Sequence, residues 1–167
     1  MDINVIFVAS LPIVYMLHDF EEIIGMKPWV KLNEMHLYSR FPKIASKLVP
    51  HLQSTSTEGF ALCVSILFML IGVITISALF TDFYKLWMGI FMVFSIHIVV
   101  HFIQWIVFRR YIPAIITSLL CIPYCIFGVM YINRIFSLAD ILAYTILVLV
   151  VSIILLYVGH RYIAKLI

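Results

Sequence analysis

The hydrophobic pattern of this 167-residue chain consists of long apolar stretches that short polar segments interrupt. A helix needs about 20 mostly apolar residues to cross the hydrocarbon core of a bilayer. Five stretches reach that length, and they predict transmembrane helices at residues 3–24, 60–80, 86–108, 112–132 and 138–158. The predicted fold is therefore all-α, a polytopic five-helix bundle that forms a single domain over residues 1–167.

The placement of lysine and arginine predicts the orientation of this bundle. Cytoplasmic segments carry an excess of these residues. The side reached by the ends of the first, third and fifth helices holds nine of them, whereas the other side holds only Lys85 and Arg134. The nine are Lys27, Lys31, Arg40, Lys43, Lys47, Arg109, Arg110, Arg161 and Lys165. We therefore expect the N-terminus outside, and the C-terminus in the cytoplasm.

The one long connection, residues 26–57, falls on the cytoplasmic side of this arrangement. Pro28 suits the first turn of a helix. The residues after it predict a short amphipathic helix that rests on the lipid headgroups.

Composition agrees with a membrane location. Hydrophobic residues make up 65% of the chain and charged residues 11%, whereas soluble domains have about 45–50% and about 25%. This excludes a soluble enzyme, and we expect a multi-pass protein of the cell (plasma) membrane. The expected partner is a membrane lipid or a lipid-like substrate, and no nucleic acid is expected. The pattern predicts no particular oligomeric state.

Ionisable residues interrupt the first predicted span, and such residues inside a membrane usually mark a functional site. Because a helix turns about 100° per residue, Glu21 and Glu22 lie within about 60° of His18 around the axis. Asp19 lies about 100° from His18, at the edge of this face or outside it. His18, Glu21 and Glu22 therefore predict one polar face near the cytoplasmic end of the span.

A second polar stripe occurs in the third predicted span. His97, His101 and Gln104 follow one another at spacings of four and three residues, which places them on one helix face. With antiparallel helices, this stripe and the face of His18 lie at a similar depth in the cytoplasmic leaflet. The sequence therefore predicts that the two clusters meet.

Glu58 opens the second predicted span on the same side of the membrane. Thr55-x-x-Glu58 has the spacing of a capping box, in which both side chains satisfy free backbone amides at a helix start. Glu58 is equally a candidate ligand, and we leave both interpretations open.

Imidazoles and carboxylates on facing helices are the groups that bind a transition metal. Imidazole suits zinc and iron, and a carboxylate adds charge or acts as a base. We predict metal ligands among His18, Glu21, Glu22, His97, His101 and Glu58. Zinc is the expected metal and iron the alternative. A structural hydrogen-bond network between the helices is the competing interpretation.

The segment "HDFEE" at residues 18–22 resembles the signature of the HXXEE-motif family of small integral membrane proteins. A second motif of that family has the form Asn-x-x-x-His. Here "HIVVH" stands in its place, with His97 where Asn is expected and His101 matching the His. The resemblance therefore supports His101 as a ligand more strongly than His97.

A third segment, "RRYIPAIIT", resembles the family's run from Arg and Tyr to Pro-Gly. Tyr111 and Pro113 are in place, and Ala114 stands instead of Gly. The resemblance covers most of the chain and implies a site but no particular reaction. Tyr111 and Thr117, with Gln104, are predicted to support the ligands or contact a substrate.

Three functions remain open at this point. The first is a hydrolase-like, metal-dependent enzyme that acts on a lipidic or isoprenoid substrate at the cytoplasmic leaflet. In it Glu21 or Glu22 activates a metal-bound water. The second is a di-iron oxidoreductase, because the histidines and glutamates suffice for two irons. The third is a carrier or sensor of protons or metal ions, since such proteins use buried Glu and His.

Overall fold

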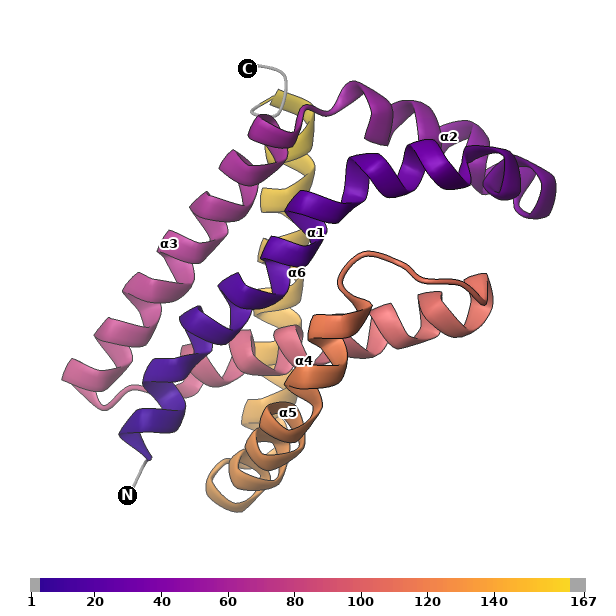
Figure 1. The fold of residues 1–167 in the computed structure, drawn as a ribbon. Coiled ribbons are helices and arrows are strands. Elements are labelled where there is room, and N and C mark those ends of the chain that lie inside the picture. Colours follow the sequence, from indigo (N-terminus) through magenta and orange to yellow (C-terminus); the bar gives the residue numbers. More distant parts are fainter. Residues whose placement is uncertain (1–3, 163–167) are drawn as a thin grey trace.

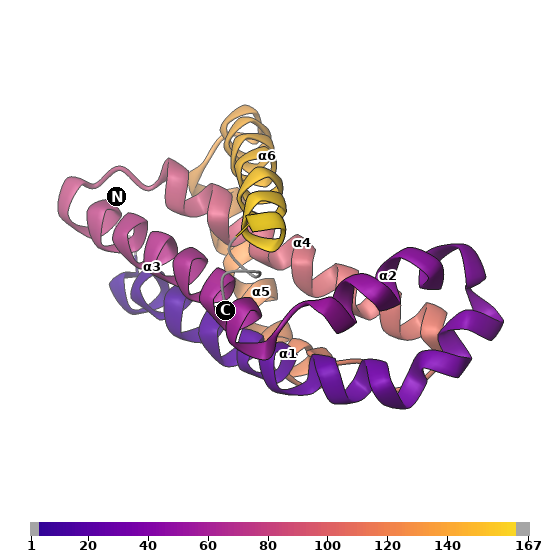
Figure 2. The ribbon, with the colours of Figure 1, turned by 90° about the horizontal axis from the view of Figure 1, so that it is seen from above.

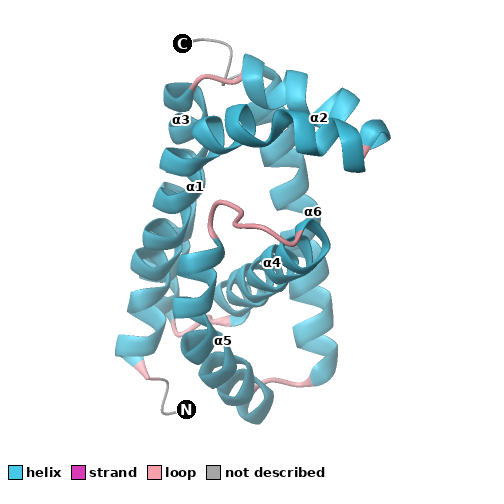
Figure 3. Cartoon of the chain, turned by 45° about the vertical axis from the view of Figure 1, so that its right-hand side comes forward, coloured by secondary structure: helices cyan, strands magenta, loops and turns pink. Residues whose placement is uncertain are grey.

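Helices account for nearly all of the chain in this computed structural model, which describes residues 4–162 and side chains as far as residue 159. Six helices and no strand occur in that range (Figures 1 and 3). They are α1 (Val5–Arg40), α2 (Pro42–Ser54), α3 (Thr57–Thr81), α4 (Lys85–Phe108), α5 (Ile115–Ile135) and α6 (Leu138–Tyr162). The predicted start of the first span at residue 3, the side chain of Arg161, and Lys165 lie outside the described residues.

Four of the helices in this range, α3 to α6, are long and apolar enough to cross a membrane. They coincide closely with the last four predicted spans, although α5 begins at Ile115 rather than at residue 112. The protein is thus an all-helical membrane protein. The first half of α1, where the span at residues 3–24 was predicted, is less apolar than these four helices, because Asp19, Glu21 and Glu22 interrupt it.

The prediction that the first helix ends near residue 24 was wrong. α1 is 36 residues long and continues through Pro28 to Arg40. Proline costs a helix one hydrogen bond, and burial of the apolar residues that follow offsets this loss. Val30 and Leu37 are almost completely buried. The helix ends at Phe41, whose position before Pro42 disfavours helical geometry.

We call residues 26–40 of α1 together with α2 the helical arm. In Figures 1 and 2 the arm extends beyond α3, and α2 folds back along the second half of α1. Its apolar residues pack on Phe108, Ile112 and Ile115, and the Trp29 indole donates a hydrogen bond of 2.7 Å to the Tyr111 carbonyl. The arm therefore covers the connection between α4 and α5.

Aromatic residues fill the core near the N-terminal end of α1. Phe7 contacts Trp87 and Phe91 edge to face, at ring-centroid distances of 5.4 and 5.3 Å. A Cβ added at Gly128 would overlap Phe91, so glycine is needed for this close approach. An ion pair of 2.8 Å between Lys85 and Asp140 joins the first turns of α4 and α6. This end of the molecule is a conventional packed core.

Ser56, and not Thr55, caps the start of α3. The Ser56 side chain accepts a hydrogen bond from the Gly59 amide, whereas the Thr55 hydroxyl donates to the His51 carbonyl in the preceding helix. The predicted capping box of Thr55 and Glu58 is therefore wrong by one residue. Glu58 lies in the first turn of α3, where an acidic side chain favours the helix dipole.

Candidate metal centre

The two predicted polar clusters meet between α1 and α4. The rings of His18, His97 and His101 lie with centroids 4.4 to 5.2 Å apart. One ring nitrogen from each lies within 4.8 Å of the other two. His18 is fully buried and His101 is only 4% exposed. Three imidazoles therefore converge inside the bundle, as the helix spacings predicted.

Thr117 on α5 orients the His18 ring. Its hydroxyl donates a hydrogen bond of 2.7 Å to Glu21, because an ionised carboxylate can only accept. The same oxygen lies 3.1 Å from His18 Nδ1 and so accepts a hydrogen bond from that nitrogen. In the neutral ring, Nε2 then carries a lone pair. This nitrogen is buried and has no hydrogen-bond partner among the described residues.

An unpartnered lone pair beside two further imidazoles is the arrangement that a metal ion completes. His97 Nε2 and His101 Nε2 lie 2.9 Å apart. Zinc–nitrogen bonds of about 2.0–2.1 Å in a tetrahedral site place ligand nitrogens about 3.3 Å apart. That spacing falls between the 2.9 Å of this pair and the 4.8 Å limit of the whole group. The three nitrogens therefore fit a metal ion after small side-chain adjustments, once the proton of the His97–His101 hydrogen bond has moved from Nε2 to Nδ1 of its ring.

Two carboxylates border the imidazoles. Glu22 Oε1 lies 3.2 Å from His101 Nε2. Asp19 and Glu22 form a second group of potential ligands with His97. Helical geometry predicted that Asp19 lies at the edge of the polar face or outside it, whereas in the structure Asp19 is only 4% exposed. Because α3, α4 and α5 all pack on α1, a wider arc of α1 is buried than the predicted face of about 100°.

Glu21, predicted as a ligand or base, faces α5 instead. Its carboxylate accepts hydrogen bonds from the Thr117 amide at 2.8 Å and the Ile116 amide at 3.3 Å. The Thr117 and Tyr111 hydroxyls donate to it at 2.7 and 2.8 Å. Ile116 and Thr117 are the second and third residues of α5, whose amides an N-cap side chain normally satisfies. Glu21 thus caps α5 from a neighbouring helix.

This cap compensates for Ala114, which precedes α5 and has no side chain that can accept a hydrogen bond. Ala114 has φ of 72°, in the left-handed region that favours glycine. The family pattern that the segment resembles has glycine here. The helix start therefore depends on Glu21 for its hydrogen bonds and on a strained alanine for its geometry.

Tyr111 lies outside the membrane-spanning helices, at the edge of the site. Burial and the hydrogen bond to Glu21 raise the pKa of Tyr111 to about 12. Its hydroxyl therefore stays protonated near neutral pH and continues to donate to Glu21. Tyr111 and Thr117 were both predicted to support the ligands. Tyr111 contacts Glu21, whereas Thr117 contacts both Glu21 and His18.

Two other predicted residues belong to neither group of potential ligands among the described residues. Glu58 is exposed at the start of α3. Gln104 is exposed on α4, one turn beyond His101, and its side chain interacts with that histidine, as a supporting residue would. Neither brings a further ligand to the cluster in this arrangement.

The fold and the cluster define a class: a helical membrane protein with histidines and carboxylates gathered inside its bundle. A family described as "Protein of unknown function with HXXEE motif" matches residues 9–128. Because that match covers more than half of the chain, the protein belongs to this family. No curated protein and no solved structure matches the chain.

Proposed function

We propose that this protein is a metal-dependent membrane enzyme that hydrolyses a lipidic or isoprenoid substrate at the cytoplasmic leaflet. The observation that carries the proposal is the buried Nε2 of His18, which has no partner and lies beside His97 and His101. A buried polar atom without a partner is costly. A bound cation would satisfy it and would also offset the buried charges of Asp19 and Glu22.

In this proposal the three histidines and one carboxylate bind the metal, most simply zinc. Zinc held by these residues would lower the pKa of a water molecule there to about 7. Glu22 or Asp19, whichever is not a ligand, accepts the proton from the attacking water. The water oxygen bonds to the carbonyl or phosphoryl centre of the substrate. The ester bond breaks, and the carboxyl group returns the proton to the leaving oxygen.

Glu21 has a positioning role in this proposal rather than the catalytic role first expected. Its four hydrogen bonds leave it little capacity to bind a metal or to accept a further proton. Through Thr117 it instead holds His18 in the tautomer that presents Nε2 to the cluster. Outer partners of this kind orient metal-binding histidines in other proteins.

A di-iron oxidoreductase is the second candidate, and one observation favours it. The two groups of potential ligands share His97, and together they contain three imidazoles and two carboxylates. Such a set is large enough for two metal ions. A count of two irons per chain, with the absorption of a di-iron centre, would replace the hydrolase proposal.

A carrier or sensor of protons or metal ions is the third candidate, and the core argues against a carrier. Phe94 contacts the His18 ring edge to face at 5.8 Å. Beyond it, Leu11, Phe91 and Trp87 are buried. These apolar side chains interrupt a polar path on this side of the His18 ring.

We further propose that the first half of α1 spans the membrane in addition to α3 to α6. The protein then lies in the plasma membrane with its N-terminus outside the cell and its C-terminus in the cytoplasm. Intramembrane ionisable residues face the interior of a bundle, and His18 and Asp19 are buried there. A tag at the N-terminus should react with an impermeant reagent from outside the cell. Reaction only after permeabilisation would contradict this orientation.

Metal analysis of the purified protein tests the proposed function. The protein should be purified in detergent without a histidine tag, and its metals measured by mass spectrometry. We expect about one zinc ion per chain. Absence of a stoichiometric transition metal after loading with zinc or iron would refute both enzyme proposals and favour a hydrogen-bond network.

A further inference from the structure

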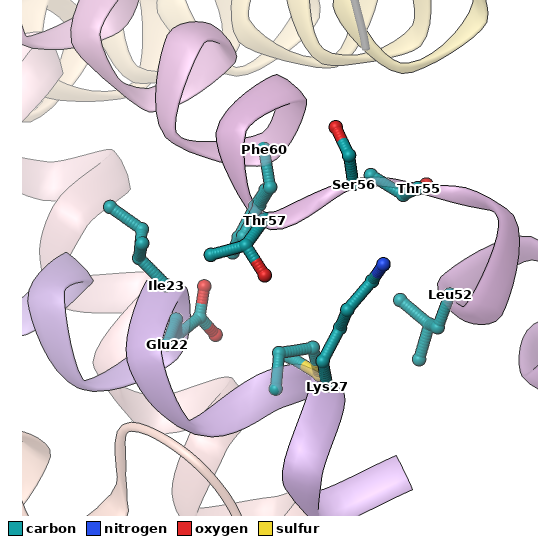
Figure 4. A pocket seen from close by; sticks show the side chains of 9 residues that line it. Glu22, Ile23, Lys27, Leu52, Thr55, Ser56, Thr57 and Phe60 are labelled. Atoms are coloured by element: carbon teal, nitrogen blue, oxygen red, sulfur yellow. The ribbon is translucent and has the colours of Figure 1, made fainter. Parts of the chain in front are cut away.

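A pocket of about 190 Å³ lies between α1, α2 and the start of α3. Glu22 lies at one end of the pocket, and Lys27 also lines it (Figure 4). Ile23, Met26 and Phe60 contribute apolar surface. Since Glu22 also lies 3.2 Å from His101, a molecule in this pocket reaches the histidine cluster through Glu22.

A wider hollow of about 740 Å³ adjoins the pocket and shares Lys27, Leu52 and Thr57 with it. Lys31 contributes a second ammonium group to the wider hollow. Drug-sized ligands occupy about 300–1,000 Å³, so the inner pocket admits only part of such a molecule. We call the two spaces together the arm cleft, because the helical arm forms one wall of both.

Two lysines and two carboxylates line the arm cleft. Glu34 accepts a hydrogen bond from Gln53 and Glu22 lies beside His101, so the attraction for an anion is confined to the surroundings of Lys27.

Neither Lys27 nor Lys31 forms an ion pair within the described part of the chain. In Figure 4 the Lys27 side chain extends toward the connection that carries Thr55 and Ser56. The Ser56 oxygen accepts from Gly59, which leaves its own proton available to a ligand. An ammonium group beside hydroxyl donors is suited to a phosphate.

We propose that the arm cleft binds a membrane lipid with a phosphate headgroup. The phosphate lies against Lys27, and the apolar segment next to it packs between Met26 and Phe60, near Glu22. The assignment of this lipid as the substrate rests on the proposed function. In that function, the cleft is the path by which the lipid reaches the histidine cluster.

Photo-crosslinking in micelles of an uncharged maltoside detergent, which has no phosphate, tests this proposal. The probe is a phosphatidic acid with a diazirine in its acyl chain close to the ester, and a diacylglycerol with the same diazirine is the uncharged control probe. Mass spectrometry of digested protein locates the labels. We expect phosphatidic acid to label Ile23, Met26 or Phe60, and the diacylglycerol to label them at least about tenfold less, as the loss of one charged hydrogen bond predicts.

Variants identify the residue responsible. Lys27→Gln should lower labelling by phosphatidic acid about tenfold, and Lys27→Arg should retain it. Lys47→Gln, which removes a lysine on the exposed side of α2, should change nothing. Equal labelling of the wild-type protein by the two probes overturns the proposal. This comparison does not depend on whether the Lys27→Gln variant folds. Equal losses in Lys27→Gln and Lys47→Gln overturn it too.

Two further measurements separate this proposal from others. An excess of glycerol phosphate should not displace the lipid probe. Displacement would contradict a lipid ligand and would show that the cleft binds a soluble phosphate compound. The His18→Ala, His101→Ala double variant should retain the labels while losing metal. If wild-type protein binds no metal but is labelled in the cleft, the lipid site is supported and the proposed metal-dependent function is refuted. Stoichiometric metal with labels confined to the outer surface of the bundle would refute the lipid site alone.

Discussion

The two glutamates of the His-x-x-Glu-Glu motif are neighbours in sequence but belong to different contacts of α1. Glu21 faces α5 and accepts four hydrogen bonds from three residues. Glu22 faces α4 and contacts one imidazole, His101. Successive residues on a helix point about 100° apart, so one short motif serves two neighbouring helices. The contact with α5 caps that helix, and the contact with α4 belongs to the proposed metal site.

The largest effect should follow from removing two imidazoles on the α4 side. His18→Ala and His101→Ala together should reduce bound metal to background. Each alone should lower metal affinity by more than the roughly 10–100-fold that outer partners contribute. His97→Asn should cost less, because an amide oxygen can still act as a ligand. Metal content per chain provides the measurement, with exposed His51→Ala as the histidine control. Full metal content in the double variant would refute the site.

The comparison becomes sharpest when each glutamate is replaced separately. Glu21→Ala removes the cap of α5 and should lower the free energy of unfolding by about 2 kcal/mol, the upper range for a lost N-cap. Glu22→Ala should leave stability closer to wild type and lower metal affinity more than Glu21→Ala does. Thermal unfolding and metal titration in the same detergent measure both quantities. The opposite pattern would show that the two faces had been assigned the wrong way round.

Thr117 joins the two contacts, and its hydroxyl can be removed with little change in shape. Thr117→Val should weaken metal binding by about 10–100-fold, as for other partners of ligating histidines. Thr117→Ser keeps a hydroxyl and should restore most of the affinity. If the Thr117→Val and Thr117→Ser variants bind metal equally well, the Thr117 hydroxyl does not orient His18.

On the α5 side, Ala114 provides a change that should stabilise the protein. A left-handed conformation costs a residue other than glycine about 1–2 kcal/mol, so Ala114→Gly should raise the free energy of unfolding by about 1 kcal/mol. Ala78→Gly, inside α3, should lower it by a similar amount. A loss of stability in Ala114→Gly would contradict the φ of 72°.

The smallest effect concerns Tyr111, which is partly exposed. Its pKa is raised from 10.0 to about 12 in the folded protein. A raised pKa stabilises the fold fully below pH 10 and loses that contribution as the pH rises from about 10 to about 12. Tyr111→Phe should therefore slightly lower stability at pH 8 and reduce the alkaline decline. Unfolding measured across this pH range tests the prediction, and identical profiles would refute it.

Local sequence determined the helices, because length, apolar character and turn residues act over short distances. The apolar stretches predicted the positions of α3 to α6, since a bilayer accepts few alternatives to an apolar helix. The spacing of His97 and His101 placed both on one face of α4. The resemblance to the HXXEE family, which rested on three short motifs, was confirmed by a match over residues 9–128.

Only the tertiary structure decided which neighbour each residue of α1 faces. Helical spacing gives directions around one axis, but the width of the buried arc depends on how many helices pack there. Asp19 is buried because α1 has neighbours on several sides, and Glu21 is held by α5 amides that no local pattern reveals. The continuation of α1 through Pro28 likewise depends on burial against α2. Such contacts join residues far apart in the chain, so their energies appear only when the helices are packed together.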